Sequence, residues 1–147
     1  MAERLAGKRI VVVGAAGNLG PVWVEALLSE GAHVIGAGLG ATGDEALGIL
    51  SKRYGKFLHV FDLDITSQGG FGSRSNFGGR ELAGIDGVVL NAGVDSVPGS
   101  GKKSLLDYRF IDWQEVFSVN VFGVVAALNH IIPSLTRGAS VVTIGSM

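Results

Sequence analysis

Residues 8–20 read KRIVVVGAAGNLG, and this stretch decides the fold. Its first half, 8–13, is a short run of branched apolar side chains that is typical of a buried strand. Glycines at a spacing of three follow it, and residues 21–30 then have helical character until Gly31 ends them. The order of strand, glycine turn and helix predicts the first half of a βαβ unit in a parallel sheet.

The rest of the chain repeats this alternation of short apolar strands and helices. The strand-like runs are rich in valine and isoleucine and do not alternate with polar residues, as expected of strands that helices cover on both faces. We therefore predict one domain, residues 1–147, with a doubly wound α/β fold and a Rossmann-like parallel sheet of about five strands. Strands are expected at 8–13, 33–37, 57–61, 87–90 and 140–144, and helices at 21–30, 44–54 and 113–132.

Within the last of these helices, apolar residues recur at spacings of three and four. This spacing is typical of a helix that lies on a sheet, so we expect the recurring residues to face the sheet. They are Phe117, Val121, Val124, Leu128 and Ile131.

One segment does not fit the alternation. Residues 69–79 contain five glycines and no aliphatic side chain. We predict a flexible glycine- and serine-rich loop at about 67–79.

Composition narrows the class of function. Only 17% of the residues are charged and the formal net charge is −1, which disfavours nucleic acid and an acidic membrane as partners. The chain has no cysteine, and its three histidines show no ligand spacing, so we expect no metal site. The N-terminal residues resemble neither a signal peptide nor a membrane span, which predicts a cytoplasmic protein.

The glycine turn itself suggests a ligand. Glycine permits positive φ and a close approach of the main chain, and the N–H groups at a helix N-terminus attract anions. We therefore predict that Gly14, Gly17, Asn18, Leu19 and Gly20 hold the pyrophosphate of a dinucleotide. A tight turn without a ligand is the alternative.

The end of the second expected strand bears on which dinucleotide binds. A carboxylate at this point accepts hydrogen bonds from a ribose 2′-hydroxyl and repels a 2′-phosphate. Residues 36–40 read GAGLG and contain neither a carboxylate nor an arginine. The sequence therefore predicts an NAD(P) site with a slight lean to NADP.

Further motifs stand in the order known from the short-chain dehydrogenase/reductase family, which the chain resembles from Lys8 onward. Asp62-Leu63-Asp64-Ile65-Thr66 is similar to the family's D-x-D-[VI]-T stretch. The resemblance implies that Asp64 meets the adenine of the cofactor, that Leu63 flanks the same ring and that Ile65 belongs to the cofactor site. Asn91-Ala92-Gly93 matches the family's NAG motif, which implies that these residues line the cofactor ribose.

Two matches concern catalysis. Asn120, in Asn120-Val121-Phe122-Gly123, matches the asparagine of the family's long helix, and Ser146 aligns with the serine that binds the substrate carbonyl or hydroxyl. An amide on an apolar helix face needs partners, so Asn120 also has a structural interpretation, in which it bonds to a neighbouring backbone. We favour the structural role for Asn120.

The family's tyrosine and lysine, in a Y-x-x-x-K unit about a dozen residues beyond the serine, have no counterpart up to Met147. Tyr54 and Tyr108 are not followed by lysine four positions later. In the family reaction a hydride passes between nicotinamide and a carbon that bears an alcohol or ketone, and the tyrosine exchanges the proton. The resemblance implies the NAD(P)-binding portion of such an oxidoreductase, which we expect to be inactive by itself.

Other interpretations stay open at this point. The chain could be a non-catalytic dinucleotide-binding sensor or partner-binding module, or a product without function. Asn18 stands where many family members have glycine, a spacing seen in extended and atypical members. Gly20-Pro21, Val94-Asp95 and Ser146-Met147 are similar to members of polysaccharide or flagellin-sugar biosynthesis.

We also expect self-association. Residues 141–144 would form an apolar edge of the sheet, and such edges recruit other chains. The resemblance implies in addition that the outer face of the long helix packs in a dimer interface. The predicted partners are a dinucleotide, a small alcohol or ketone in the full-length form, and a second copy of the chain.

Overall fold

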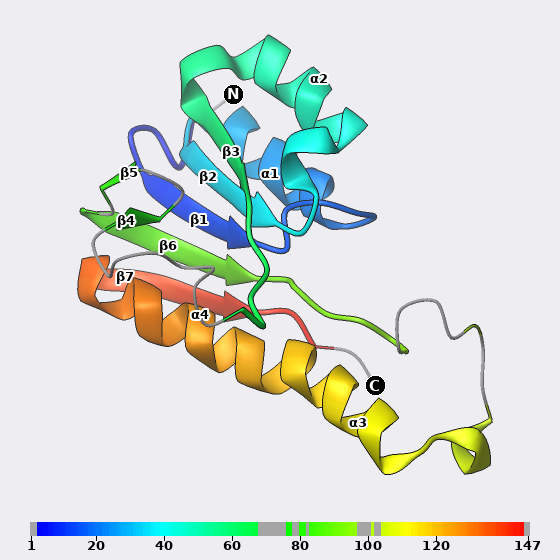
Figure 1. Ribbon diagram of the computed structural model, residues 1–147. Helices are drawn as coiled ribbons and strands as arrows, with labels where there is room; N and C mark the ends of the chain where they lie inside the picture. Colours follow the sequence, from blue (N-terminus) through cyan, green and yellow to red (C-terminus); the bar gives the residue numbers. More distant parts are fainter. Residues whose placement is uncertain are drawn as a thin grey trace.

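A five-stranded parallel sheet forms the centre of the protein (Figure 1). The computed structural model describes residues 3–67, 76–77, 80–81, 83–96, 101 and 104–145. The order of the strands across the sheet is β3-β2-β1-β6-β7. Their bounds are β1 Arg9–Val13, β2 His33–Gly38, β3 Leu58–Asp62, β6 Ile85–Leu90 and β7 Leu135–Thr143.

Helices cover both faces of this sheet. Helices α1 (Gly20–Ser29) and α2 (Glu45–Tyr54) lie on one face. A long helical segment lies on the other face and consists of α3 (Phe110–Phe117), the π-helical turn η4 (Ser118–Gly123) and α4 (Val124–Ile131). Short 3₁₀ turns join the elements: η1 (Ala41–Gly43), η2 (Gly55–Phe57), η3 (Leu105–Asp107) and η5 (Ile132–Ser134).

The central strand shows why both faces need a helix. Successive side chains of a strand point to opposite faces, and every position of β1 after Arg9 is apolar and buried. Val11 and Val13 pack in one core with Ala127 and Ile131 of the long helical segment. The other core contains Ile10 and Val12 together with residues of α1 and α2, among them Val24, Leu28, Leu47 and Leu50. The predicted doubly wound α/β sheet is therefore confirmed.

The topology favours a ligand-binding crevice at the carboxyl ends of the central strands. The chain passes from β1 to β2 and β3 on one side and then returns to the other side of β1 with β6 and β7. In sheets of this kind, ligands bind beyond the carboxyl ends of the strands where the direction of winding changes. That point lies here between β1 and β6, which pair in parallel from Ile10↔Gly87 to Val13↔Leu90.

The long helical segment turns only part of the predicted face to the sheet. Phe117 and Val121 were expected to face the sheet, yet 49% and 41% of their surfaces are exposed. The prediction is confirmed further along the segment, where Ile131 is buried in the core and Val124 and Leu128 pack against it. The π-helical turn explains the difference at Phe117 and Val121, because its i→i+5 bonds insert extra residues and rotate the stretch before α4 relative to the face that α4 turns to the sheet.

Two predicted strands are longer than expected. The strand expected at 87–90 begins at Ile85, and the one expected at 140–144 begins at Leu135. Within the loop predicted at 67–79, Asn76–Phe77 forms a short strand, β4, that pairs antiparallel with β5 (Arg80–Glu81). The remainder of that loop beyond Ser67 lies outside the described residues, as does the predicted site residue Ser146.

The stretch Phe110–Ser134 has 25 helical residues and a mean hydropathy of 1.7, so by length and composition alone it could cross a membrane. One such helix is weak evidence for a span, because a helix that covers a sheet meets the same criteria. Here Ala127 and Ile131 pack on the sheet, which accounts for part of the apolar character.

Candidate dinucleotide-binding site

The glycine turn between β1 and α1 contains glycines of two kinds. A Cβ on Gly14 would lie 2.4 Å from the backbone nitrogen of Ala92, and one on Gly20 would lie 2.1 Å from the carbonyl oxygen of Ala15. These two glycines are therefore needed for packing of the main chain. Gly17 also has positive φ, at 89°, but a Cβ there would meet nothing within 4 Å. The space in front of Gly17 is open to a ligand.

A cavity of about 590 Å³ opens beside this turn, at the carboxyl ends of β1, β2 and β6. Its volume is within the usual range for small-molecule sites, about 300–1,000 Å³. Of the predicted cofactor-binding residues, all except Gly20 line it. The lining residues are Gly14, Ala16, Gly17, Asn18, Leu19, Gly38, Leu39, Leu63, Asp64, Ile65, Thr66, Asn91, Ala92, Gly93, Val94 and Val119.

Helix α1 points its N-terminus at the same place. Leu19 is the N-cap residue, no side chain of the described residues caps the first turn, and Pro21 is the second residue of the helix. Because Pro21 has no N–H, the turn residues before it and the first helical N–H groups carry the positive end of the helix dipole. Asn18 and Leu19 thus lie where an anionic group is favoured.

The NAG segment after β6 is fixed by its asparagine. The side chain of Asn91 donates from Nδ2 to the carbonyl oxygen of Gly14 at 2.8 Å and accepts at Oδ1 from Nε1 of Trp23 at 3.0 Å. Its backbone N–H donates to the carbonyl of Val13 at 2.8 Å. Asn91 therefore joins β6 to the glycine turn and to α1, and Ala92 is held against Gly14.

Asn120 has the structural role that the sequence favoured. Its Nδ2 donates to the carbonyl oxygen of Val94 and its Oδ1 accepts from the N–H of Val94, both at 2.8 Å. The side chain thus holds the chain just beyond the NAG segment. Gly123 completes the N-x-x-G pattern, because a Cβ there would lie 2.7 Å from Cγ1 of Ile65 and would push η4 off the cavity wall.

Asp64, which follows the end of β3, also lines the cavity. Its Oδ1 accepts from the hydroxyl of Thr66 at 2.6 Å and from the N–H of Thr66 at 2.9 Å. These hydrogen bonds, the hydroxyl first, lower the pKa of Asp64, so the carboxylate is ionised at neutral pH. Asp64 therefore offers a fixed acceptor to a ligand.

The sequence interpretation missed Asp44 as a residue of this region. Asp44 is the N-cap of α2, where its Oδ1 accepts from the N–H of Leu47 at 3.0 Å. Its Oδ2 accepts from the N–H of Gly17 at 3.1 Å. The bond from Leu47, followed by that from Gly17, lowers the pKa of Asp44. Asp44 was visible in the sequence only as the start of a helix, because its contact with Gly17 spans 27 positions.

Among the described side chains, no three histidine, aspartate or glutamate residues are grouped as a metal ion would require. The glycine turn, the uncapped helix N-terminus and the cavity at the winding change define a dinucleotide-binding domain of the Rossmann class.

Within that class, the chain belongs to the short-chain dehydrogenase family, whose family model, described as "short chain dehydrogenase", matches residues 8–147. Fluoren-9-ol dehydrogenase of Terrabacter sp. (strain DBF63) is 32% identical over 97% of this chain and 41% of its own length. The chain spans about half the length of the curated relatives it matches.

Solved structures agree with the fold. A carbonyl reductase from Pseudomonas aeruginosa PAO1 superposes with a TM-score of 0.81, at 20% identity, over 95% of this chain and 62% of that one. The RhlG/NADP active-site complex of Pseudomonas aeruginosa is 28% identical with a TM-score of 0.72, over 99% of this chain and 57% of that one.

Proposed function

We propose that residues 1–147 form one dinucleotide-binding domain, which holds NAD(P) as the cofactor-binding portion of an oxidoreductase acting on an alcohol/ketone pair. The observation that carries this proposal is the cavity between the glycine turn and the NAG segment, with an uncapped helix N-terminus at its edge. The open space in front of Gly17 is where a bound group can approach the main chain.

The lining residues divide into three groups by chemistry. The backbone N–H groups of Asn18 and Leu19, with the dipole of α1, would bind the pyrophosphate. Asp64 and Ile65 would meet the adenine, one as a hydrogen-bond acceptor and the other as an apolar surface. Gly93, with Asn91 and Ala92 behind it, would leave room for a ribose.

When bound, the nicotinamide supplies hydride exchange with a carbon that bears an alcohol or ketone. The chain's own residues would orient the reactants. Ser146 would bind the substrate oxygen, and Asn120 would act as a positioning residue through Val94. Neither Tyr54 nor Tyr108 has a lysine four positions later. We therefore propose that these 147 residues alone bind nucleotide without turnover.

Either nicotinamide dinucleotide suits these features. The slight lean to NADP comes from residues 36–40, which contain no carboxylate. The similarity to a protein solved with NADP, at 28% identity, is compatible with that lean. We also propose a cytoplasmic location for the protein.

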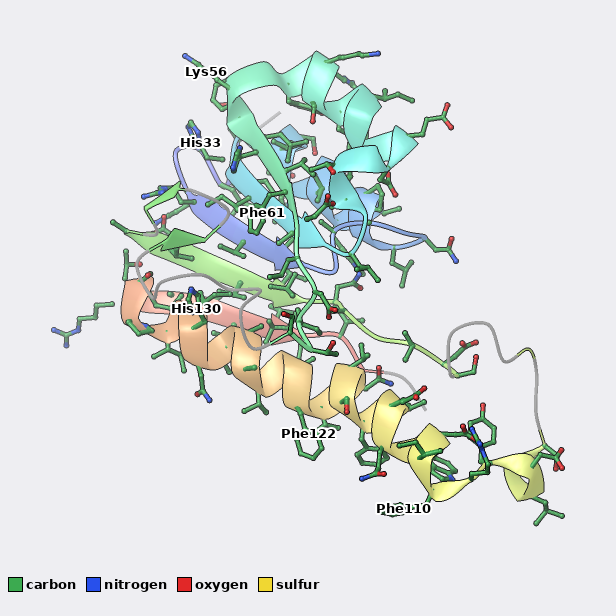
Figure 2. All side chains as sticks on the ribbon, viewed as in Figure 1. His33, Lys56, Phe61, Phe110, Phe122 and His130 are labelled. Carbon is green, nitrogen blue, oxygen red and sulfur yellow. The ribbon has the colours of Figure 1, made fainter. Side chains whose placement is uncertain are left out.

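A second copy of the chain is the proposed protein partner. Phe110 and Phe122 point away from the sheet on the outer side of the long helical segment (Figure 2). Phe110, Phe122 and Trp113 are exposed, although aromatic side chains are energetically favourable when buried. An apolar surface of this kind marks an interaction site in soluble proteins.

Calorimetric titration with NADH and NADPH tests the proposed function. We expect saturable binding to the purified chain and a clear loss of affinity in Asp64→Ala. Glu3→Gln is the control, because Glu3 lies far from the cavity. Its Cβ is next to Gly31, between the C-terminal end of α1 and the start of β2, whereas the cavity lies at the carboxyl ends of the strands. A folded chain that binds neither dinucleotide at millimolar concentration would refute the proposal.

A further inference from the structure

One side of the cavity is formed by the end of β2. Gly38 and Leu39 line the cavity there, and Gly38 lies against the glycine turn, where a Cβ on it would be 3.3 Å from the backbone nitrogen of Ala16. In doubly wound sheets, the residue just after the second strand meets the 2′-position of the adenosine ribose. Leu39 has no polar group and 79% of its surface is exposed, so its side chain provides no selection between a hydroxyl and a phosphate.

The chain then turns back toward the cavity and brings a carboxylate with it. After Leu39, the turn η1 leads directly to Asp44, whose Oδ2 accepts from the N–H of Gly17. Gly17 is itself part of the cavity wall. The negative charge of Asp44 therefore lies directly behind the cavity wall, hydrogen-bonded to Gly17, which is part of that wall.

A second carboxylate supports the same turn. Asp62, the last residue of β3, accepts at Oδ2 from the hydroxyl of Thr42 at 2.6 Å and at Oδ1 from the N–H of Thr42 at 2.9 Å. Thr42 lies in η1. The bonds from Thr42 lower the pKa of Asp62, so Asp44 and Asp62 are both ionised at neutral pH.

Several basic groups of the described part of the chain lie away from these carboxylates. No residue that lines the cavity is lysine or arginine. Lys56 lies at the other end of β3 from Asp62 (Figure 2). The arginines that form ion pairs have other partners, as in Arg53 with Glu25 and Arg4 with Glu30.

We infer that Asp44, with Asp62 behind it, makes this site select NAD(H) over NADP(H). A 2′-phosphate adds about two negative charges at neutral pH, which would lie near the Asp44 carboxylate behind Gly17, with Asp62 further back, while no lysine or arginine is among the described residues that line the cavity. A 2′-hydroxyl carries no such cost. The inference rests on the proposed function, since it concerns the ribose end of the same cavity.

This preference opposes the slight lean to NADP drawn from the sequence. That lean considered only residues 36–40, where a selecting carboxylate usually stands. The fold supplies the charge from positions further along the chain, because η1 returns Asp44 to Gly17.

The test compares the affinities of NADH and NADPH in the wild-type chain and in Asp44→Asn. Asparagine is as good an N-cap residue as aspartate, so the start of α2 is retained while the charge is lost. We expect the wild type to bind NADH about tenfold more tightly than NADPH at low salt. In Asp44→Asn the affinity for NADPH should rise about fivefold, and that for NADH should stay within about twofold.

Two controls separate charge from structure. Glu3→Gln makes the same change of net charge at the far edge of the sheet and should leave the ratio of the two affinities unchanged. Raising the salt concentration should bring the ratio of the NADH affinity to the NADPH affinity of the wild type closer to one, because exposed charges are screened. If Asp44→Asn unfolds, Asp62→Asn takes its place. It should likewise reduce the preference for NADH over NADPH.

The outcomes are distinct. Equal binding of both dinucleotides, or tighter binding of NADPH by the wild type, would overturn the inference and leave the proposed function standing. A ratio that does not change in Asp44→Asn or Asp62→Asn would overturn it as well. Binding of neither dinucleotide to the folded wild type would refute the proposed function itself.

Discussion

The two glycines at the start of the glycine turn should respond very differently to alanine. Gly14 and Gly17 have φ values of 83° and 89°, so an alanine at either position costs about 1–2 kcal/mol of backbone strain. Gly14→Ala would in addition place a Cβ 2.4 Å from the backbone nitrogen of Ala92. Backbone atoms have no rotamer to adopt, so the ends of β1 and β6 must separate. Overpacking of this kind adds about 1–3 kcal/mol.

The measurement is the free energy of unfolding from urea titration, with thermal unfolding alongside. We expect a loss of about 2–5 kcal/mol for Gly14→Ala and about 1–2 kcal/mol for Gly17→Ala. For a chain of this size each kcal/mol corresponds to a fall in Tm of about 2–4 °C. Gly17→Ala should also weaken binding of the dinucleotide, because the added methyl group borders the cavity. Equal destabilisation by the two substitutions would refute the assignment of Gly14 to packing and Gly17 to the ligand.

Three further predictions concern the hydrogen bonds and the outer surface. Trp23→Phe removes the donor to Asn91 and should lower the free energy of unfolding by about 1–2 kcal/mol in urea titration; an unchanged midpoint would count against this bond. The pKa of Asp64 is lowered by Thr66, so its contribution to stability is present above the unfolded-state value of about 3.9 and is lost as pH falls through the lower folded-state value. The difference in unfolding free energy between the wild type and Asp64→Asn should therefore shrink as the solution is acidified below that range, and a constant difference would contradict the assignment. Phe117→Asp should shift sedimentation at micromolar concentration from a dimer or larger species to a monomer, and a wild type that is already monomeric would refute the proposed self-association.

Local patterns in the sequence were sufficient to predict the sheet and the glycine turn. Runs of valine and isoleucine identify the strands because a parallel sheet buries both faces, and the turn between 8–13 and 21–30 depends only on neighbouring residues. The predicted cofactor-binding residues other than Gly20 line one cavity, since each lies in the loop that follows the carboxyl end of a strand. Gly20 lies behind the wall, where it packs against Ala15.

What the sequence did not reveal depends on contacts between distant positions. The π-helical turn left Phe117 and Val121 exposed while Val124, Leu128 and Ile131 pack as predicted, because a spacing of three and four assumes an uninterrupted α-helix. Trp23 and Asn91 are 68 positions apart, and neither residue type by itself predicts a hydrogen bond between them. Asp44 was the larger omission, since its role requires knowing where the chain goes after β2.

The most direct test of the dinucleotide site is a series of two-dimensional amide NMR spectra of the chain, recorded during titration with NADH. We predict that the largest shifts occur at the amides of Gly17, Asn18 and Leu19, with smaller ones at Gly93 and at Asp64. Amides at the opposite edge of the sheet, such as that of Arg9, should not move. Shifts confined to that opposite edge, or an unchanged spectrum at saturating NADH, would contradict the account.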